Sequence, residues 1–316
     1  MKGVPGQIAA DAIIFRTHFW DAFAQRQFER LQTHARGCDV FVLVDETGGK
    51  VGGIAHDRVV RVSEASLLGM GLARAGEGNL LWFNGDYPLY GFMQLCPGYE
   101  RYLQLEYDVV VNMDLCALLE KLRADRVDFL GLSKGEPASQ WYWLPSCMDL
   151  YRPGDLRHQL ICFSVFSAAA LRHLWRRRLE HTTLHRNGTI TAWPMCEGFI
   201  ATELATAGFR VAELSQYGDT QAYDHWPPYL EADLPALQGH DFIHPLLDED
   251  RFVASMMKYQ VGIGGFLRPD SLFHRKLRRL PARRYARALV TTFASKVSRV
   301  LRDLMAVQRT ARKAAS

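Results

Sequence analysis

Tyr102-Leu103-Gln104-Leu105-Glu106-Tyr107-Asp108-Val109-Val110 is the stretch of sequence that decides the fold. Its apolar residues predict a short buried strand, which ends in two carboxylates, Glu106 and Asp108, separated by one residue. Because residues i and i+2 of an extended segment point to the same face, both carboxylates are expected to aim at one point beyond the strand. Open α/β sheets bind their ligands at that end of their strands.

Two converging carboxylates repel each other unless a cation lies between them. Mg²⁺ and Mn²⁺ take oxygen ligands and usually share them with a substrate phosphate. The alternative is a solvated loop acid beside a helix N-cap, and the spacing alone favours that alternative. Motifs elsewhere in the chain are therefore needed to choose between a cation site and a solvated loop acid.

Strands alternate with helices on both sides of this stretch. A strand at 13–19, a helix at 20–35 and a strand at 39–44 predict one unit of a parallel sheet. Apolar runs predict further strands at 58–62, 127–132, 160–166 and 209–214, and helical spacing predicts helices at 115–122, 168–179 and 196–207. The sequence thus predicts an α/β fold with a mixed, mostly parallel sheet flanked by helices.

Several polar residues near predicted strand ends are candidates for ligand contacts. Asp45 follows a buried strand and could contact a ribose or base, although an Asp at a strand end is often only a cap. Asn84 and Asp86 alternate with aromatic residues in the segment 82–90, a pattern typical of sites that stack on a ring, and equally of an aromatic-packed loop. The long segment 133–160, rich in Trp, Tyr and Pro, is typical of a substrate lid.

The composition is that of an ordinary globular protein: 316 residues, of which 48% are hydrophobic and 23% charged. The sequence has no apolar run of about 18 residues, which argues against a membrane span, and its start does not resemble a secretory signal. No Cys-x-x-Cys pair is present, which predicts reduced thiols in a cytosolic protein rather than a disulfide framework or a zinc site. The six cysteines are Cys38, Cys96, Cys116, Cys147, Cys162 and Cys196.

The charge is divided unevenly along the chain. Residues 267–316 contain 14 Lys/Arg and 2 Asp/Glu, whereas the other 266 residues contain 24 and 32. Apolar residues recur every three or four positions in this basic tail: Leu289, Phe293, Val297, Val300, Leu301 and Leu304. The pattern predicts a catalytic domain at 1–266 and a basic amphipathic helix within 267–316 that lies on an anionic membrane surface. Packing on the body or on a second copy is the alternative, and nucleic acid fits poorly because the body is acidic and lacks a recognition motif.

The order of these motifs resembles glycosyltransferases of the GT-A fold, a Rossmann-like fold, over roughly residues 11–255. Glu106-Tyr107-Asp108 is similar to the family's Asp-x-Asp metal motif, with Glu in place of the first Asp. Glu197 matches the acid that opens a later helix, and His244 matches a late His that joins the metal. The acidic pair of that helix is here Cys-Glu, which leaves the base open between Glu197 and Glu203.

The resemblance implies a nucleotide-sugar donor. Asp108, helped by His244, would hold a divalent cation, Mn²⁺ or Mg²⁺, that neutralises the leaving nucleoside diphosphate. Glu106 would contact the donor sugar or ribose, and Arg16, at the end of the first strand, would contact the diphosphate. Glu197 or Glu203 would remove the proton of the acceptor hydroxyl in an inverting enzyme. The sequence leaves inversion and retention both open.

The expected protein is a cytoplasmic, membrane-peripheral glycosyltransferase of bacterial-type polysaccharide or glycolipid synthesis. Its expected acceptor is a glycan or a lipid-linked sugar, and a homo-oligomer is one expected form of the protein. One rival is a nucleotidyl- or phosphotransferase that uses the same carboxylates. The other is a non-catalytic adaptor, a GT-A-like domain held at the membrane by its tail.

Overall fold

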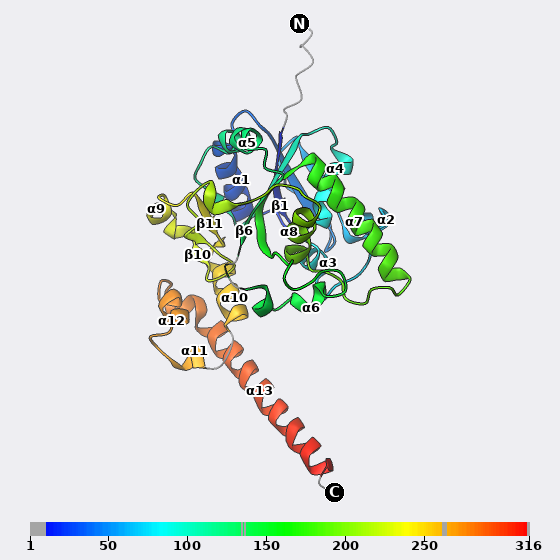
Figure 1. The fold of residues 1–316 in the computed structure, drawn as a ribbon. Coiled ribbons are helices and arrows are strands. Elements are labelled where there is room, and N and C mark those ends of the chain that lie inside the picture. The colour runs from blue at the N-terminus through cyan, green and yellow to red at the C-terminus, as the bar shows by residue number, and fades with distance from the viewer. Residues whose placement is uncertain (1–10, 134, 136, 261–263, 315–316) are drawn as a thin grey trace. The chain divides into compact units, whose positions relative to one another are not determined.

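The computed structural model describes residues 11–133, 135, 137–260 and 264–314 of the chain (Figure 1). Residues 1–10, on which the expected absence of a secretory signal depends, lie outside this part. The chain forms two compact units, one made of Met1–Asp224 and Gly239–Ile243 and the other of His225–Gln238 and His244–Ser316. The second unit includes residues on both sides of position 267, so the predicted division at that position remains a prediction.

A seven-stranded sheet forms the centre of the first unit, in the order β3-β2-β1-β4-β7-β6-β8. Strands β1, β2, β3 and β4 are parallel, as are β6 and β8, whereas β7 runs antiparallel to both of its neighbours. The predicted mixed, mostly parallel sheet flanked by helices is therefore confirmed. The strands span β1 Asp11–Thr17, β2 Asp39–Asp45, β3 Val59–Val62, β4 Arg101–Glu106, β6 Phe129–Ser133, β7 Gln159–Ser167 and β8 Val211–Glu213.

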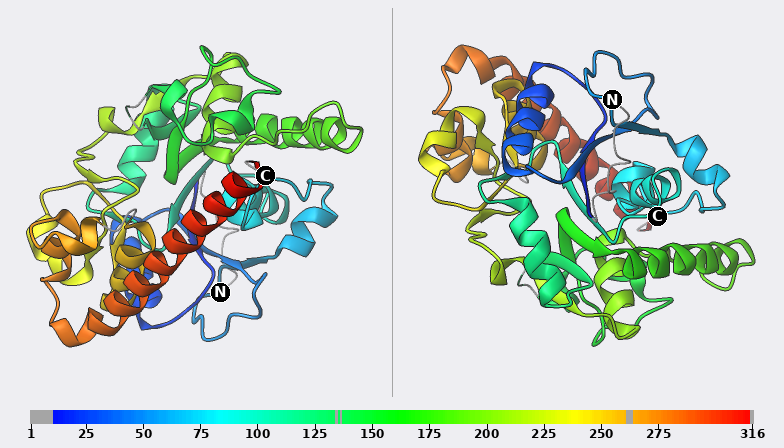
Figure 2. Two further views of the ribbon diagram at one scale, coloured as in Figure 1. Left: turned by 90° about the horizontal axis from the view of Figure 1, so that it is seen from below. Right: turned by 90° about the horizontal axis from the view of Figure 1, so that it is seen from above.

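Helices cover both faces of this sheet. In β1, Ala12 and Ile14 belong to one apolar core, and Ile13 and Phe15 belong to the other, because successive residues of a strand point to opposite faces. α1 (Ala22–His34) and α5 (Leu115–Ala124) supply one core, whereas α4 (Tyr87–Leu95), α7 (Ala168–Arg186) and α8 (Cys196–Thr206) supply the other. Figures 1 and 2 show α1 and α7 on opposite sides of the sheet.

The remaining elements of the first unit are short. In the first unit they are α2 Glu64–Gly69, α3 Leu80–Phe83, α6 Leu144–Cys147, β5 Val110–Val111 and β9 Ala222–Tyr223. β11, Phe242–His244, pairs with β5 in a small three-stranded sheet that also contains β9. The segment 82–90, which the sequence leaves open as a ring-binding site or an aromatic-packed loop, falls in α3, α4 and the turn between them, and most of its apolar residues are buried. The helix expected at 168–179 extends to Arg186.

The strand predicted within residues 102–110 is shorter than expected. β4 ends at Glu106, and the chain turns at Tyr107 and Asp108, where the Val109 N–H donates to the Glu106 carbonyl at 3.0 Å. The expectation that Glu106 and Asp108 share one face of an extended strand is therefore wrong, because alternation holds only while the backbone stays extended.

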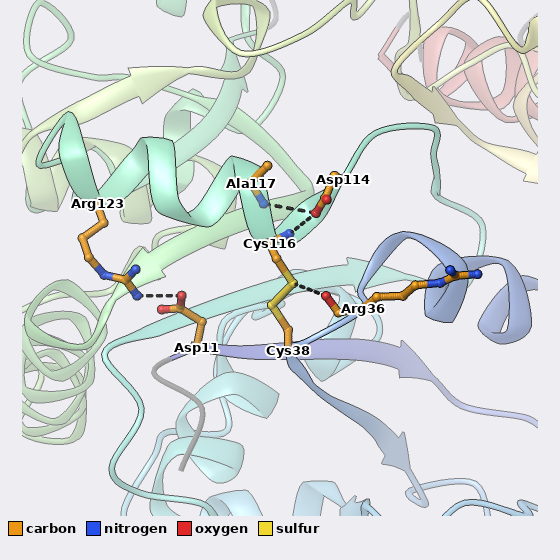
Figure 3. Close-up of a disulfide and its surroundings, with 7 residues drawn as sticks. All are labelled: Asp11, Arg36, Cys38, Asp114, Cys116, Ala117 and Arg123. Carbon is orange, nitrogen blue, oxygen red and sulfur yellow. Dashed lines mark hydrogen bonds and ion pairs between the residues drawn. A yellow bond between two sulfur atoms is a disulfide. The ribbon is translucent and has the colours of Figure 1, made fainter. Parts of the chain in front are cut away.

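Cys38 and Cys116 form a disulfide, with their Cα atoms 6.3 Å apart (Figure 3). The bond joins the residue before β2 to the first turn of α5, and Figure 3 shows the Asp11–Arg123 ion pair near it. The expectation of six reduced thiols is thus wrong for these two cysteines. They lie 78 residues apart in the chain, so only the packing of α5 against the sheet brings them together.

Replacing both Cys38 and Cys116 by serine is expected to lower the free energy of unfolding by about 4 kcal/mol, because the disulfide restricts the unfolded chain over a long loop. Urea denaturation measures this loss, and Cys96→Ser is the control, since Cys96 is a free cysteine. The denatured wild type, purified without reductant, should react with a thiol reagent at four cysteines. Reaction of all the cysteines would contradict the bond.

The second unit consists of a short parallel pair, β10 (Tyr229–Leu230) with β12 (Leu246–Leu247), and of helices. Its helices are α9 Leu234–Leu237, α10 Glu249–Tyr259, α11 Gly264–Leu267, α12 Leu272–Leu277 and α13 Ala282–Ala314. Phe266 is buried, and its ring centroid lies 4.8 Å from that of Phe273 and 5.8 Å from that of Phe293 in α13, with the rings tilted in both pairs. α13 confirms the predicted helical tail. No helix of the described chain is both long and apolar enough to cross a membrane.

The apolar stripe predicted in the tail is only partly covered within this unit. Leu289, Phe293 and Val297 are half-buried, whereas Val300 is 44% exposed. The side chains of Leu301 and Leu304 lie outside what the structure describes. The N-terminal part of α13 therefore packs within its own unit, as the alternative to membrane binding expects for that part.

Candidate active site

The carboxyl ends of β1, β2 and β4 lie at one edge of the sheet, because the three strands are adjacent and parallel. Arg16 and Glu106 are direct neighbours in the register of β1 and β4, and Arg16 Nη1 lies 3.9 Å from Glu106 Oε1. Asp45 ends β2, where its Oδ1 accepts a hydrogen bond of 2.8 Å from the Thr47 N–H. The structure thus brings three predicted site residues to the same edge, and Asp45 caps a turn there.

Arg16 is held in place through one end of its guanidinium. Nη1 donates to the Gly85 carbonyl and to Gln104 Oε1, each at 2.8 Å. Gln104 is buried and donates through Nε2 to Ser164 Oγ and to the Ile161 carbonyl. Within the described residues, all hydrogen bonds from the Arg16 side chain use Nη1. Its other donors, Nε and Nη2, make no hydrogen bond to the described residues, and guanidinium donors match phosphate oxygens.

Asp108, just beyond the end of β4, carries a carboxyl group with a raised pKa. The residue as a whole is partly exposed, but its Oδ1 is inaccessible to solvent. Burial raises the pKa of this carboxyl to about 7, and a hydrogen bond with its own backbone N–H opposes the shift. Burial also raises the pKa of Tyr223, and the nearby charges of Cys162, Glu106 and Asp108 contribute. Both carboxylates therefore act on Tyr223, whose hydroxyl accepts a bond of 2.6 Å from the Phe163 N–H.

The Asn84 side chain makes its hydrogen bonds inside the protein and not at a binding site for the donor substrate. It is fully buried, and its Nδ2 donates to the carbonyls of Ala75 and Leu80, both at 3.0 Å. Its Oδ1 accepts from Trp193 Nε1 at 2.7 Å. These bonds use both ends of the amide, so the structure gives Asn84 a packing role and does not support its prediction as a donor contact.

Asp86 is also interior, where it pairs with Arg178 of α7. The Asp86 side chain is 1% exposed and that of Arg178 is 0% exposed. Arg178 Nε donates to Asp86 Oδ2 at 2.7 Å and Nη2 to Oδ1 at 3.1 Å, while the Tyr90 hydroxyl donates to Oδ2 at 2.8 Å. We therefore correct the donor contact predicted for Asp86 to a structural ion pair, since a ligand cannot reach it.

The same arginine supports the start of α8. Arg178 Nη1 donates to the Pro194 carbonyl at 2.9 Å, and its guanidinium lies 3.9 Å from the ring centroid of Phe199 in α8. Burial disfavours its charge, but Asp86 more than offsets this and raises the pKa of Arg178. Arg178 thus connects Asp86 to both sides of the α8 N-terminus.

His181, one turn after Arg178 in α7, is fully buried near Arg177 and Arg178. Its Nε2 lies 3.4 Å from Arg177 Nη2, which requires that nitrogen to accept. Burial, together with the charges of Arg178 and Arg177, lowers the pKa of His181 to about 3. The imidazole is therefore neutral in the folded protein over the physiological range.

Acidification is expected to destabilise the protein through His181. In the unfolded chain a histidine binds a proton below about pH 6.5, whereas the folded state takes none up until about pH 3. The contribution of His181 to the free energy of unfolding is therefore complete above about pH 6.5 and is lost as pH falls from there toward about 3. At pH 5 this residue alone lowers the free energy of unfolding by about 2 kcal/mol. Urea denaturation at several pH values measures the slope, and His181→Gln should remove this part of it. An unchanged slope in that variant would contradict the assignment.

Glu197 and Glu203 lie on α8 in different surroundings. Glu203 Oε2 accepts from the Tyr151 hydroxyl, and Oε1 accepts from Arg177 Nε, both at 2.8 Å. His173 Nε2 also lies 3.2 Å from Oε1. Glu197 lies in the first turn of α8 and is 8% exposed. Both oxygens of Glu203 are thus committed to protein partners, and the choice of base between Glu197 and Glu203 stays a prediction.

His244 is buried at the end of β11 and belongs to the second unit. Its metal role stays a prediction. In the described part of the chain, no group of three or more His, Cys, Asp and Glu side chains converges as a metal site would. Mg²⁺ commonly takes only one or two carboxylates from a protein and its other ligands from phosphate and water, so a single carboxylate such as that of Asp108 fits that mode.

Sequence reasoning missed three residues of this region. Gln104 orients Arg16, Tyr223 lies near both carboxylates, and Arg178 supports α8. A polar residue in the middle of an apolar strand was a usable signal for Gln104. The sequence contained no signal for Arg178, because this residue lies in a run of three arginines that also fits a solvated helix end.

No protein-family model and no curated protein matches the chain. Among solved structures, the chain is similar to a glycosyltransferase involved in the glycosylation of the major capsid of PBCV-1, at 12% identity and a TM-score of 0.38, over 74% of this chain and 92% of that one. It is also similar to mouse xyloside xylosyltransferase 1 in its apo form, at 12% identity and a TM-score of 0.43, over 74% of this chain and 97% of that one. Both neighbours are glycosyltransferases, the class that the sequence motifs resemble, but likenesses this distant carry no argument about activity.

Proposed function

We propose that this protein is a glycosyltransferase that moves a sugar from a nucleotide-sugar donor to a hydroxyl of a glycan or lipid-linked acceptor. The observation that carries the proposal is the arrangement at the edge of the sheet, where Arg16 holds unused donors beside the Glu106 carboxylate and Asp108 follows two residues after Glu106. A guanidinium beside acidic oxygen ligands is suited to a diphosphate bound together with a cation.

The residues at this edge have separate tasks in the proposal. Arg16 binds and orients the donor diphosphate through Nε and Nη2. Glu106, 33% exposed and weakly paired with Arg16, contacts the donor sugar or ribose. Asp108 would hold Mn²⁺ or Mg²⁺, which when bound neutralises the leaving nucleoside diphosphate. An enclosed carboxyl with a raised pKa fits this task, because a nearby cation favours its ionised form.

Glu197 acts on the acceptor in the proposal. From the first turn of α8 it would accept the proton of the acceptor hydroxyl as that oxygen attacks the sugar carbon. This step applies to an inverting enzyme.

A thermal-shift screen of nucleoside diphosphates and nucleotide sugars, with and without Mn²⁺, tests the donor site. Ligand at about a hundred times its Kd stabilises the folded state by about 2.7 kcal/mol, which corresponds to a shift of roughly 5 °C or more. We expect this shift with one nucleoside diphosphate in the presence of Mn²⁺, and none in Asp108→Asn. The exposed Asp57→Asn is the matched control. The proposal fails if no nucleotide shifts the wild type.

Membrane association is a second part of the proposal, supported by the exposed cations of α13. Arg283, Arg287, Arg299 and Arg302 are exposed, as are Val290 and Met305, at 66% and 51%. Each basic residue near an anionic surface contributes about 1 kcal/mol. The protein should therefore sediment with vesicles that contain phosphatidylglycerol and not with vesicles of phosphatidylcholine alone, and high salt should release it. Replacing the four arginines by glutamine should abolish sedimentation; equal sedimentation with both vesicle types would contradict an electrostatic anchor.

A further inference from the structure

Three large aromatic side chains lie together on the surface of the first unit: Trp82 of α3, with Tyr142 and Trp143 from the loop before α6. We call them the aromatic platform. Trp82 is 52% exposed and Tyr142 is 78% exposed. The Trp143 ring is half-buried and lies 5.7 Å from Trp82 and 4.8 Å from Tyr142, centroid to centroid, perpendicular to the Tyr142 ring. Exposed apolar groups gathered in this way mark binding surfaces more often than isolated ones do.

The loop of Tyr142 and Trp143 packs against the start of α8. Ser146 Oγ accepts from the Met195 N–H at 3.2 Å. Gly198 leaves room for Trp141, since a Cβ added at Gly198 would lie 2.7 Å from the Trp141 ring. The loop is therefore fixed on the helical turn that carries Glu197.

The segment that carries Trp82 contacts both parts of the candidate active site. The Trp82 carbonyl lies 4.0 Å from Cys196 Sγ, next to Glu197 in the chain. Three residues after Trp82, the Gly85 carbonyl accepts from Arg16 Nη1. The aromatic platform is thus tied to the α8 N-terminus and, through one short segment, to the donor edge of the sheet.

We infer that the aromatic platform is the acceptor subsite and that it binds a sugar ring of a carbohydrate acceptor. This inference rests on the proposed function, which requires an acceptor beside Glu197. A sugar ring has an apolar face of C–H groups that packs on an aromatic face, and a rim of hydroxyls that needs polar neighbours. The perpendicular rings of Tyr142 and Trp143 offer a face and an edge, and Ser139 and Gln140 on the same loop are exposed to bind hydroxyls.

The chemistry of the loop favours a sugar over a bilayer or a second copy. Aromatic residues that insert into a membrane interface are usually accompanied by Lys or Arg, and residues 137–148 contain neither. A stable contact between two copies needs about 800 Å² from each, much more than three aromatic side chains provide.

The test compares the double variant Trp82→Ala/Tyr142→Ala with wild type. Both side chains are largely exposed, so the variant should fold, and Tyr259→Ala is the matched control, since Tyr259 is 45% exposed in the second unit. Saturation-transfer NMR is run with the methyl glycosides and disaccharides of the common hexoses, pentoses and N-acetylhexosamines. We expect transfer to the ring protons of at least one sugar with wild type and with the control, and about tenfold weaker binding with the double variant, the change that losing about 1.4 kcal/mol of contact produces.

A kinetic measurement separates this inference from the proposed function. With the donor identified, the double variant should raise the KM for the acceptor sugar about tenfold and leave donor hydrolysis without acceptor unchanged. If the double variant turns over the donor with an unchanged KM for the acceptor, the aromatic platform is not the acceptor subsite, but the proposed function stands. The protein could also bind sugar through the aromatic platform and bind no nucleotide. The platform would then be a carbohydrate-binding surface and not an acceptor subsite.

Other results of the same comparison also overturn the inference. Wild type that transfers saturation to none of the sugars has no sugar site at the platform. Equal transfer in the double variant places the sugar elsewhere. Vesicle binding or self-association that is lost in the double variant, without sugar binding, assigns the platform to a membrane or to a second copy.

Discussion

Replacing Arg178 by methionine is expected to lower the free energy of unfolding by about 3–5 kcal/mol. The substitution removes the cation from a fully buried pair and leaves Asp86, 1% exposed, with only the Tyr90 hydroxyl as a described donor. It also removes the guanidinium from the Phe199 ring and from the Pro194 carbonyl. Urea denaturation followed by circular dichroism measures the loss.

Arg176→Met is the matched control, because Arg176 is exposed on the same helix two residues earlier. Surface substitutions of this kind change stability by about 0.5 kcal/mol or less. The double variant Asp86→Asn/Arg178→Met should recover part of the loss, because it leaves no uncompensated charge in the interior. Equal losses for Arg178→Met and Arg176→Met would show that the buried pair adds nothing.

The second large effect is expected at Asp108. Asp108→Asn should lower the rate of nucleoside diphosphate release from the donor by about 10²-fold or more, because it removes the charge that, in the proposed function, would hold the cation at the leaving group. The rate is measured with Mn²⁺ at a pH about one unit above 7, where the wild-type carboxyl is ionised. The apparent affinity of the wild type for Mn²⁺ should rise with pH through about 7, since the protonated carboxyl binds no cation.

A stability measurement shows whether Asp108→Asn acts on chemistry alone. The folded-state pKa of Asp108, about 7, lies above the ordinary value of 3.8 for an aspartate carboxyl. The folded protein therefore holds this proton more tightly, so the residue stabilises the fold at low pH and loses that contribution as pH rises through about 7. Asparagine stays neutral, so the variant should be at least as stable as wild type in mildly alkaline buffer. Asp57→Asn should leave both rate and stability unchanged, and full activity in Asp108→Asn would remove the metal role from Asp108.

The order of strands and helices followed from sequence patterns because each depends on neighbours in the chain. Apolar runs located β1, β2, β6 and β7, and Ser63 and Ser167 begin helices with side-chain hydrogen bonds to backbone N–H groups, as their residue types suggest. Arg16 and Glu106 could be placed at one edge from the sequence, since each ends a strand of a parallel sheet.

Burial of polar residues depended on contacts between distant parts of the chain. Asp86 and Arg178 lie 92 residues apart, and the patterns around them fit an open loop and a solvated helix end equally well. Cys38 and Cys116 carried no spacing signal for the same reason. The turn at Asp108 also depends on tertiary structure, because β5 leaves the main sheet to pair with β11.

The sequence by itself determined the fold class, the edge of the sheet where the charged residues gather and the basic helical tail, because these follow from local periodicity and composition. Only the tertiary structure decided which acids are open to a ligand and which are committed inside. That distinction depends on the partners that each carboxylate meets when the helices pack on the sheet: Arg178 for Asp86, and Tyr151 and Arg177 for Glu203.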